Sequence, residues 1–303
     1  MNIEKLFERL TCRIPNELIL KNESMKKHTS FQIGGPTDLM LLASDVQYIR
    51  TAIFECRSMG IPYYVIGNGS NLLVCDKGFR GLIIKISDHF NKISINGNKV
   101  WAQAGALIST VSKATIDAGL SGLEFAVGIP GTIGGAIAMN AGAYTGEMKD
   151  IVQSVLVLNS DGEEFEITNK ALDFSYRNSR IQKEGLIMLE ADMELKHGDR
   201  KAINALVDEY TSLRQLKQPL SFPSAGSIFK RPPGYFAGKL IYEAGLRGLR
   251  IGDAQVSGLH CGFIVNLGNA TAYDVIALTE IVKDTVKKNA GIDLFLEIKI
   301  IGE

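Results

Sequence analysis

The sequence lacks the features that mark several common classes of protein. It has 33 basic and 33 acidic residues among 303, so it lacks the positive excess typical of nucleic-acid-binding proteins. Its longest apolar runs are much shorter than a membrane span, and its first residues predict an amphipathic helix rather than a signal peptide. We therefore expect a cytoplasmic protein that binds neither nucleic acid nor membrane.

Cysteine and histidine are scarce, with four of each. No C-x-x-C pair occurs, and the histidines lack metal-ligand spacing, so we predict free thiols and no metal site. A nucleophilic pair of His260 and Cys261 is disfavoured, because neighbouring residues on a strand point to opposite faces.

The usual phosphate-binding motifs are also missing. The sequence contains no G-x-x-x-x-G-K-[ST], and no G-x-G-x-x-G opens a helix after a first strand. Instead, Gly128–Tyr144, G-I-P-G-T-I-G-G-A-I-A-M-N-A-G-A-Y, consists largely of small residues and has no charge. Bare backbone N–H groups in such a segment can approach a bulky anion, so we predict that this glycine segment holds a pyrophosphate. The alternative is a glycine-rich turn in the core or a closely packed helix of small residues.

A second cluster lies in V-I-G-N-G-S-N-L-L-V, where two short apolar runs predict strands and Gly67–Asn71 predicts a hairpin turn between them. Beside the glycine segment, this glycine turn is expected to contact the other side of the same diphosphate. The candidate cofactor-binding residues are Gly67, Asn68, Gly69, Ser70, Asn71, Ile129, Pro130, Gly131, Thr132, Gly134, Gly135, Asn140 and Gly142.

Three further motifs could carry chemistry. Phe174–Arg180, F-S-Y-R-N-S-R, sets Arg177 beside an aromatic residue and two hydroxyls, an arrangement suited to holding a carboxylate, although exposed loop arginines would look the same. Pro223–Gly234 surrounds Ser227 with small residues, which would let its hydroxyl approach a ligand. Because no G-x-S-x-G elbow is present, a serine hydrolase is disfavoured, and the hydroxyl stays a candidate proton donor. In L-F-L-E-I-K-I-I at the C-terminus, alternation predicts a strand carrying Glu297, for which a solvent-facing charge pair is the alternative.

The periodicities predict an α+β protein. A helix over 46–59 and short strands come first, then a mostly antiparallel middle region, and an apolar helical stripe near 203–213 leads into a third part. The expected domains are residues 1–84, 85–205 and 206–303, and the last strand could pack back on the earlier ones.

Taken together, these motifs resemble the UDP-N-acetylenolpyruvoylglucosamine reductase family. The resemblance rests on H-T-S-F-x-I-G-G-P, G-N-G-S-N-L-L-V, the glycine segment, S-Y-R-x-S-R, P-S-A-G-S-x-F-K-R-P, H-x-G-F-I-V-N and E-I-K-I-I-G-E, in this order over nearly the whole chain. The chain looks like the shorter (type II) subclass, which lacks an inserted substrate-covering loop. Its departures are Lys299 in E-I-K, where arginine is more usual, and Cys261, where a small residue is more typical.

The resemblance implies a two-subdomain FAD-binding fold of the vanillyl-alcohol-oxidase (p-cresol methylhydroxylase) type plus a C-terminal α+β substrate domain. FAD would be bound noncovalently at its diphosphate by the two glycine clusters. NADPH would be the co-substrate, and the enzyme would act as a monomer in peptidoglycan precursor synthesis, which serves cell wall biogenesis, cell shape and division.

The resemblance also implies a reaction, the reduction of UDP-N-acetylglucosamine enolpyruvate to UDP-N-acetylmuramate. Hydride passes from NADPH to the flavin and from flavin N5 to the enolpyruvyl carbon, and Ser227 then protonates the adjacent carbon. Arg177 and Glu297 would stabilise the developing enolate. The candidate substrate-binding residues are Tyr176, Lys217, Lys230 and Lys239. A flavin oxidase of the same fold and a noncatalytic binding module stay open as alternatives.

Overall fold

The computed structural model describes residues 2–86 and 88–303, which divide into two compact units. The first unit contains the chain up to Lys21, Leu39–Asn68 and Gly81–Arg214, and the second contains Asn22–Asp38, Gly69–Arg80 and Gln215–Glu303. Each unit has its own cluster of buried apolar side chains. The chain crosses between the units several times, so neither unit is one continuous segment.

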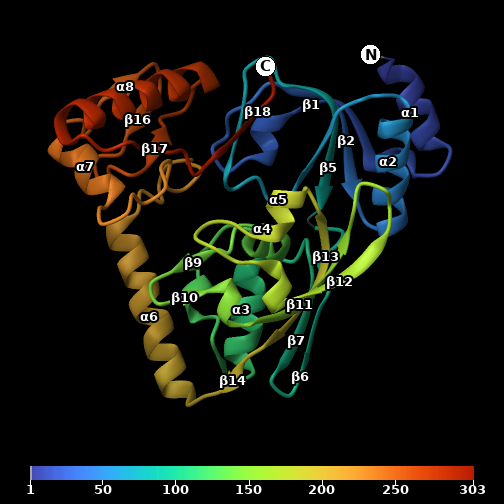
Figure 1. Cartoon of the computed structure of the whole chain (residues 1–303), viewed down its shortest axis with the longest axis horizontal. Coiled ribbons are helices and arrows are strands. Elements are labelled where there is room, and N and C mark those ends of the chain that lie inside the picture. Colours follow the sequence, from blue (N-terminus) through green and yellow to red (C-terminus); the bar gives the residue numbers. More distant parts are fainter. Residues whose placement is uncertain (1, 87) are drawn as a thin grey trace. The chain divides into compact units, whose positions relative to one another are not determined.

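A sheet covered by helices lies largely in the first unit. Its strand order is β1-β2-β5-β3, formed by β1 (Ile19–Ser24), β2 (Pro36–Ala43), β5 (Phe79–Ile86) and β3 (Tyr63–Ile66), and β3 runs parallel to β5. Helices α1 (Ile3–Thr11) and α2 (Val46–Ser58) lie beside this sheet (Figure 1). As the spacing predicts, α2 buries Ile49, Ile53 and Cys56.

The rest of the first unit is built around an antiparallel sheet of order β12-β11-β13-β7-β6. Its strands are β6 (Ile93–Asn96), β7 (Lys99–Gln103), β11 (Val152–Leu158), β12 (Glu164–Thr168) and β13 (Ile187–Glu194). Two short pairs, β8 (Leu120–Ser121) with β14 (Lys196–His197) and β9 (Gly142–Ala143) with β10 (Gly146–Glu147), complete its strands. Its helices are α3 (Ile108–Asp117), α4 (Ile133–Ala138), α5 (Arg180–Glu184) and most of α6 (Arg200–Lys217).

The second unit combines a small sheet with two helices, α7 (Ala237–Glu243) and α8 (Ala272–Ala290), which lie near its strands in Figure 1. The sheet has the order β15 (Arg250–Ile251), β16 (Ala254–Val256), β17 (Ile264–Asn266). The start of α8 is held by the Asp76 carboxylate, which accepts hydrogen bonds from Ala272 N–H at 2.8 Å and Tyr273 N–H at 3.0 Å. Separately, β4 (Leu72–Val74) pairs in parallel with β18 (Lys299–Ile301).

Short 3₁₀ turns occupy several connections, namely Asn16–Leu18, Met25–His28, Glu124–Ala126, Met148–Asp150 and Asn169–Leu172. In the described part of the chain, every helix is too short or too polar to span a bilayer.

The α+β class is confirmed, and the mostly antiparallel middle region includes a hairpin in which β6 pairs with β7 through Asn96 and Lys99. The last strand does pair with residues 72–74, which the sequence assigned to the first domain. It is shorter than predicted, because the ladder covers only Lys299–Ile301. The division at 84/85 and 205/206 stays a prediction.

Candidate active site

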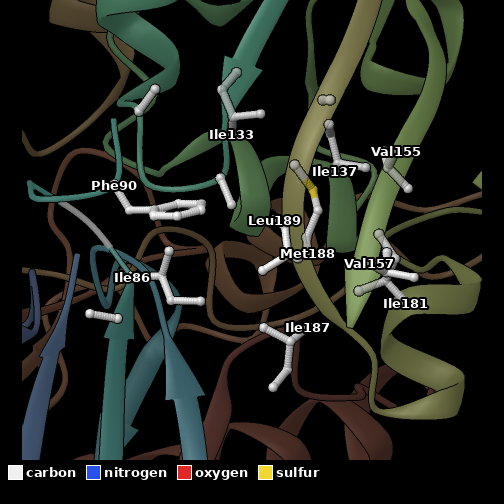
Figure 2. Close-up of a cluster of buried hydrophobic side chains, with 14 of the residues drawn as sticks. Ile86, Phe90, Ile133, Ile137, Val155, Val157, Ile181, Ile187, Met188 and Leu189 are labelled. Carbon is white, nitrogen blue, oxygen red and sulfur yellow. The ribbon is translucent and has the colours of Figure 1, made fainter. Parts of the chain in front are cut away.

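The glycine segment contains a short helix with one apolar face. Helix α4 begins after Thr132, whose hydroxyl accepts a hydrogen bond from Gly135 N–H at 3.3 Å. Ile133 and Ile137, one turn apart, lie in the buried cluster with side chains of β11 and β13 (Figure 2). Gly135 is exposed, so at this position the helix presents backbone that no side chain covers.

The two glycine clusters meet within the first unit. The Asn68 side-chain amide donates a hydrogen bond to Pro130 O at 2.6 Å. An ideal Cβ built on Gly67 would overlap Thr132 Oγ1 and lie 3.2 Å from its Cγ2. Only glycine therefore allows this close approach, and the predicted neighbourhood of the two clusters is confirmed for Gly67 and Asn68.

This junction is rich in hydrogen-bond donors. Within residues 2–86 and 88–303, the backbone N–H groups of Asn68, Gly131 and Thr132 donate to no protein acceptor. Free N–H groups on small residues are the donors that a phosphate group needs, so the junction fits a dinucleotide diphosphate.

The predicted hairpin at the glycine turn is wrong. The flanking strands form as expected, but β3 pairs with β5 and β4 pairs with β18, so they belong to different sheets. Gly67 and Asn68 belong to the first unit, whereas Gly69, Ser70 and Asn71 belong to the second. Gly69 has φ +62°, and a Cβ there would overlap the backbone oxygen of His28.

Arg177 is attached to the C-terminal end of the glycine segment. Its guanidinium donates to Gly142 O at 2.9 Å and more weakly to Asn140 O at 3.5 Å. The central carbon of this guanidinium lies 5.2 Å from the centre of the Tyr176 ring, and Tyr176 is about half exposed. The predicted carboxylate-binding arginine and the predicted diphosphate site are thus contiguous parts of one unit.

Asn140 fixes the loop that carries Arg177. It is 1% exposed, and its amide donates to Glu147 Oε2 at 2.7 Å and to Ser175 O at 3.2 Å, while its oxygen accepts from Lys149 N–H at 3.0 Å. Its side chain is therefore occupied within the protein. Gly142 pairs with Glu147 in the β9–β10 ladder, and a Cβ at this position would lie 2.7 Å from Glu147 Cγ.

In the second unit, Ser227 and Glu297 lie on adjacent segments. Glu297 N–H donates to Ile228 O at 2.8 Å, and Ile228 N–H donates to Gly262 O at 2.9 Å. Ser227 follows Gly226, whose φ is +77°, and both Ser227 and Glu297 are half-buried. The backbone thus brings the candidate donor and the candidate carboxyl group to neighbouring positions.

The candidate substrate lysines differ in their surroundings. Lys230 is half-buried and its backbone N–H donates to Phe295 O at 2.8 Å, next to Ser227 and Glu297. Lys217 is exposed at the end of α6. Lys239 is exposed on α7, with its ammonium 3.6 Å from Glu243 of the same helix. Of the three, Lys230 has the placement most consistent with a site around Ser227.

A Cys–His nucleophile is not supported. His260 Nδ1 accepts from Gly262 N–H at 3.0 Å and its ring lies edge-on to Phe263, while burial lowers its pKa. Burial also raises the pKa of Cys261, which is 8% exposed. The four cysteines are free, as predicted. No cluster of metal-ligating side chains occurs in the part of the chain that the structure describes.

Arg177 lies in the first unit, and Ser227 and Glu297 in the second. Their meeting at one substrate stays a prediction.

Two residues of α6 touch the glycine segment and were not predicted to do so. The Tyr210 ring stacks on Tyr144, with centroids 4.1 Å apart, and Arg214 donates to Gly128 O at 3.2 Å. From the sequence, Tyr210 was expected only as part of an apolar stripe. No local pattern pairs these residues with the segment, because the contact joins positions far apart in the chain.

The junction of the two glycine clusters, with its free N–H groups, and the mixed α+β architecture together indicate the class of protein. Residues 37–168 match the family model for the FAD binding domain. The structure also superposes on that of Phl p 4.0202, a glucose dehydrogenase, with a TM-score of 0.51 at 14% identity over 74% of this chain and 52% of that one, which shows a shared fold. The protein is a FAD-dependent oxidoreductase with the FAD-binding fold that the sequence predicted.

The family follows from closer relatives. Residues 218–301 match the model for the C-terminal domain of UDP-N-acetylenolpyruvoylglucosamine reductase. Reductases of that name from Alkaliphilus oremlandii and Clostridioides difficile are 50% and 48% identical, covering 99% and 100% of this chain and 98% and 100% of their own lengths. The crystal structure of the Thermus caldophilus reductase superposes with a TM-score of 0.81 at 36% identity, over 94% of this chain and 98% of that one. The chain belongs to the UDP-N-acetylenolpyruvoylglucosamine reductase family, and its length fits the shorter subclass.

Proposed function

We propose that this protein reduces UDP-N-acetylglucosamine enolpyruvate to UDP-N-acetylmuramate, with NADPH as the reductant, in cytoplasmic peptidoglycan precursor synthesis. Family membership supports the substrate. The observation that carries the proposal is the attachment of Arg177 to Gly142 O and Asn140 O. This attachment fixes a carboxylate-binding guanidinium at the end of the segment that fits the cofactor diphosphate.

The residues of the donor junction would hold FAD without a covalent bond. Asn68, Gly131 and Thr132 offer backbone N–H groups, and Gly67 keeps the approach open. When bound, FAD would supply the two-electron, hydride-transfer chemistry between NADPH and the substrate.

Arg177 has the chemistry to stabilise the substrate as its double bond is reduced. Addition of hydride to the terminal enolpyruvyl carbon leaves negative charge on the adjacent carbon, and this charge spreads into the carboxylate. A guanidinium presents five N–H donors in a fixed plane, so Arg177 can bind its backbone carbonyls and still face a carboxylate. Fixed donors of this kind stabilise developing charge without reorganising during the reaction.

Ser227 and Glu297 would complete the reaction from the second unit. The Ser227 hydroxyl donates a proton to the carbanion-like carbon, a strong base that a weak acid can protonate when it is well positioned. Glu297 would donate a hydrogen bond to the enolate if its carboxyl group carries a proton in the complex. Lys230, three residues after Ser227 and half-buried, would help to orient the hydroxyl and to stabilise it after proton transfer.

The remaining candidates would bind the nucleotide portion. Lys217 and Lys239 offer ammonium groups for the two phosphates, and Tyr176 offers an exposed ring beside Arg177 for stacking or hydrogen bonding. We further propose that the enzyme acts as a monomer, which sedimentation analysis would test.

Anaerobic stopped-flow absorbance of the two half-reactions tests this function. NADPH should bleach the flavin, and the enolpyruvyl UDP-sugar should restore its colour with formation of UDP-N-acetylmuramate. Reoxidation by oxygen but not by the sugar would indicate an oxidase. A flavin that stays reduced with the sugar bound would indicate a binding module, and either result would refute the proposal.

A further inference from the structure

Asn71 holds the chain on both sides of Ile298, directly after Glu297. Its side-chain amide donates to Glu297 O at 3.1 Å, and its backbone oxygen accepts from Lys299 N–H at 2.9 Å. The next residues continue this contact as a parallel ladder, with Lys299 opposite Leu72. A single asparagine in the glycine turn thus fixes the position of residues 297–299.

Glu297 in turn is bonded to the segment that carries Ser227. Glu297 N–H donates to Ile228 O, and Lys230 N–H donates to Phe295 O, both at 2.8 Å. The N–H and the C=O of Glu297 therefore have different partners. The N–H is bonded to the serine segment, and the C=O is bonded to the Asn71 amide.

Ser30 completes the connection from the other end of the serine segment. Its hydroxyl donates to Ser224 O at 2.7 Å, and its N–H donates to Gly69 O at 3.3 Å. The glycine turn, the serine segment and the segment around Glu297 are consequently tied together by backbone and side-chain hydrogen bonds. All of these contacts lie within the second unit.

We propose that Asn71 is a positioning residue for the substrate-reducing half-reaction, acting through Glu297 and Ser227. This inference rests on the proposed function. The sequence predicted a cofactor-binding role for Asn71, but its amide is directed at a protein carbonyl. Without that amide, Glu297 O loses a hydrogen bond, and the segment that carries the carboxyl group is held less firmly. Displacement of a reacting group by about 1 Å can slow a reaction by roughly 100-fold.

The test compares both half-reactions in the wild type, Asn71→Ala and Asn71→Asp, all loaded with FAD. NADPH-driven flavin reduction should stay close to the wild-type rate in both variants. Reoxidation by the enolpyruvyl UDP-sugar should slow by roughly 10- to 100-fold, with the Kd of the sugar nearly unchanged. Asn71→Asp keeps the shape of the side chain but sets a carboxylate against Glu297 O, so it should be at least as slow as Asn71→Ala.

A double mutant separates positioning from general damage to the fold. Because Asn71 acts through Ser227, Asn71→Ala should slow a Ser227→Ala enzyme far less than it slows the wild type. The matched control is Asn98→Ala, which removes an amide that bonds Glu194 on the surface of the first unit. This control should leave both half-reactions unchanged.

Several results would overturn the inference. One is an Asn71→Ala enzyme that binds FAD poorly but reacts normally once loaded, since Asn71 would then be a cofactor ligand. The second is equal slowing of both half-reactions, and the third is full additivity with Ser227→Ala. If the wild type itself is not reoxidised by the sugar, the proposed function fails and this inference fails with it. If the sugar reoxidises the wild type and Asn71→Ala at the same rate, the inference is refuted but the proposed function is not.

Discussion

Substitution of Gly67 by alanine should damage the junction of the two glycine clusters. The new Cβ would overlap Thr132 Oγ1 and lie 3.2 Å from Thr132 Cγ2, so the threonine side chain has to move. Thr132 is also the N-cap of α4, where its oxygen accepts the Gly135 N–H. Movement of Thr132 therefore removes the cap as well as straining its rotamer.

These two effects set the expected magnitude. An off-rotamer side chain costs about 0.5–1.5 kcal/mol, and loss of an N-cap costs about 0.5–2 kcal/mol. Together they predict that Gly67→Ala lowers the free energy of unfolding of the apoprotein by roughly 1–3 kcal/mol. Because the neighbouring N–H groups of Gly131 and Thr132 would shift too, the Kd for FAD should rise by about tenfold for each 1.4 kcal/mol of lost donor geometry.

Urea unfolding of the apoprotein and a fluorescence titration with FAD measure the two quantities. The decisive comparison is a double-mutant cycle with Thr132→Ala, which removes both atoms that the new Cβ would approach most closely. In that background, Gly67→Ala should cost little further stability. Gly258→Ala is the control, since Gly258 is exposed and its Cβ would have no neighbour within 4 Å.

If Gly67→Ala destabilises the protein equally in both backgrounds, the clash with Thr132 is not the cause and the reasoning is wrong. Unchanged FAD affinity despite a large loss of stability would show that the junction is structural and does not hold the cofactor.

Three further predictions concern single residues. Ser227→Ala should leave NADPH-driven flavin reduction near normal and slow reoxidation by the UDP-sugar by roughly 10²–10⁴-fold in stopped-flow experiments, and equal loss of both half-reactions would contradict the assigned role. Arg177→Lys should weaken substrate use by roughly 10- to 150-fold in kcat/KM, since an ammonium cannot bind Gly142 O and a carboxylate in one plane, and a change below twofold would argue against it. Burial lowers the pKa of His260 below 6.5, so the folded state favours the neutral ring, and this contribution to stability is lost as the pH falls from 6.5 through the folded pKa. In urea unfolding, the free energy of unfolding should therefore fall less over this pH range for His260→Gln than for the wild type. Identical pH profiles would refute the assignment.

The glycine segment could be predicted from the sequence because its signal is local. A run of small uncharged residues exposes backbone whichever element it joins, here a short helix with Ile133 and Ile137 in the core. The same holds for α2, whose buried residues follow a single period over 46–58. In such cases, composition and periodicity within one segment are enough to predict which residues are buried and where backbone is exposed.

The glycine turn shows where local information ends. Two apolar runs around G-N-G-S-N look like a hairpin, yet β3 pairs with residues 82–85 and β4 with residues 299–301. Which partner a strand takes is decided by contacts across the whole fold, not by the turn itself. For the same reason, the contact of Asn71 with Glu297, across 226 positions, could not be predicted from either motif alone.

Backbone strain is concentrated around the glycine segment. Asn140, Tyr144 and Arg177 have φ values of +42°, +54° and +54°, half of the six non-glycine residues with positive φ in the part of the chain that is described. Each such residue costs on the order of 1–2 kcal/mol unless its surroundings compensate. At Asn140 the compensation comes from its side-chain hydrogen bonds, and at Arg177 from its bond to Gly142 O. At Tyr144 it comes from stacking on the Tyr210 ring and from the hydrogen bond of the Tyr144 hydroxyl to Tyr210 O. These compensating contacts hold Arg177 against the backbone of the glycine segment, as the proposed function requires of an arginine beside the predicted cofactor site.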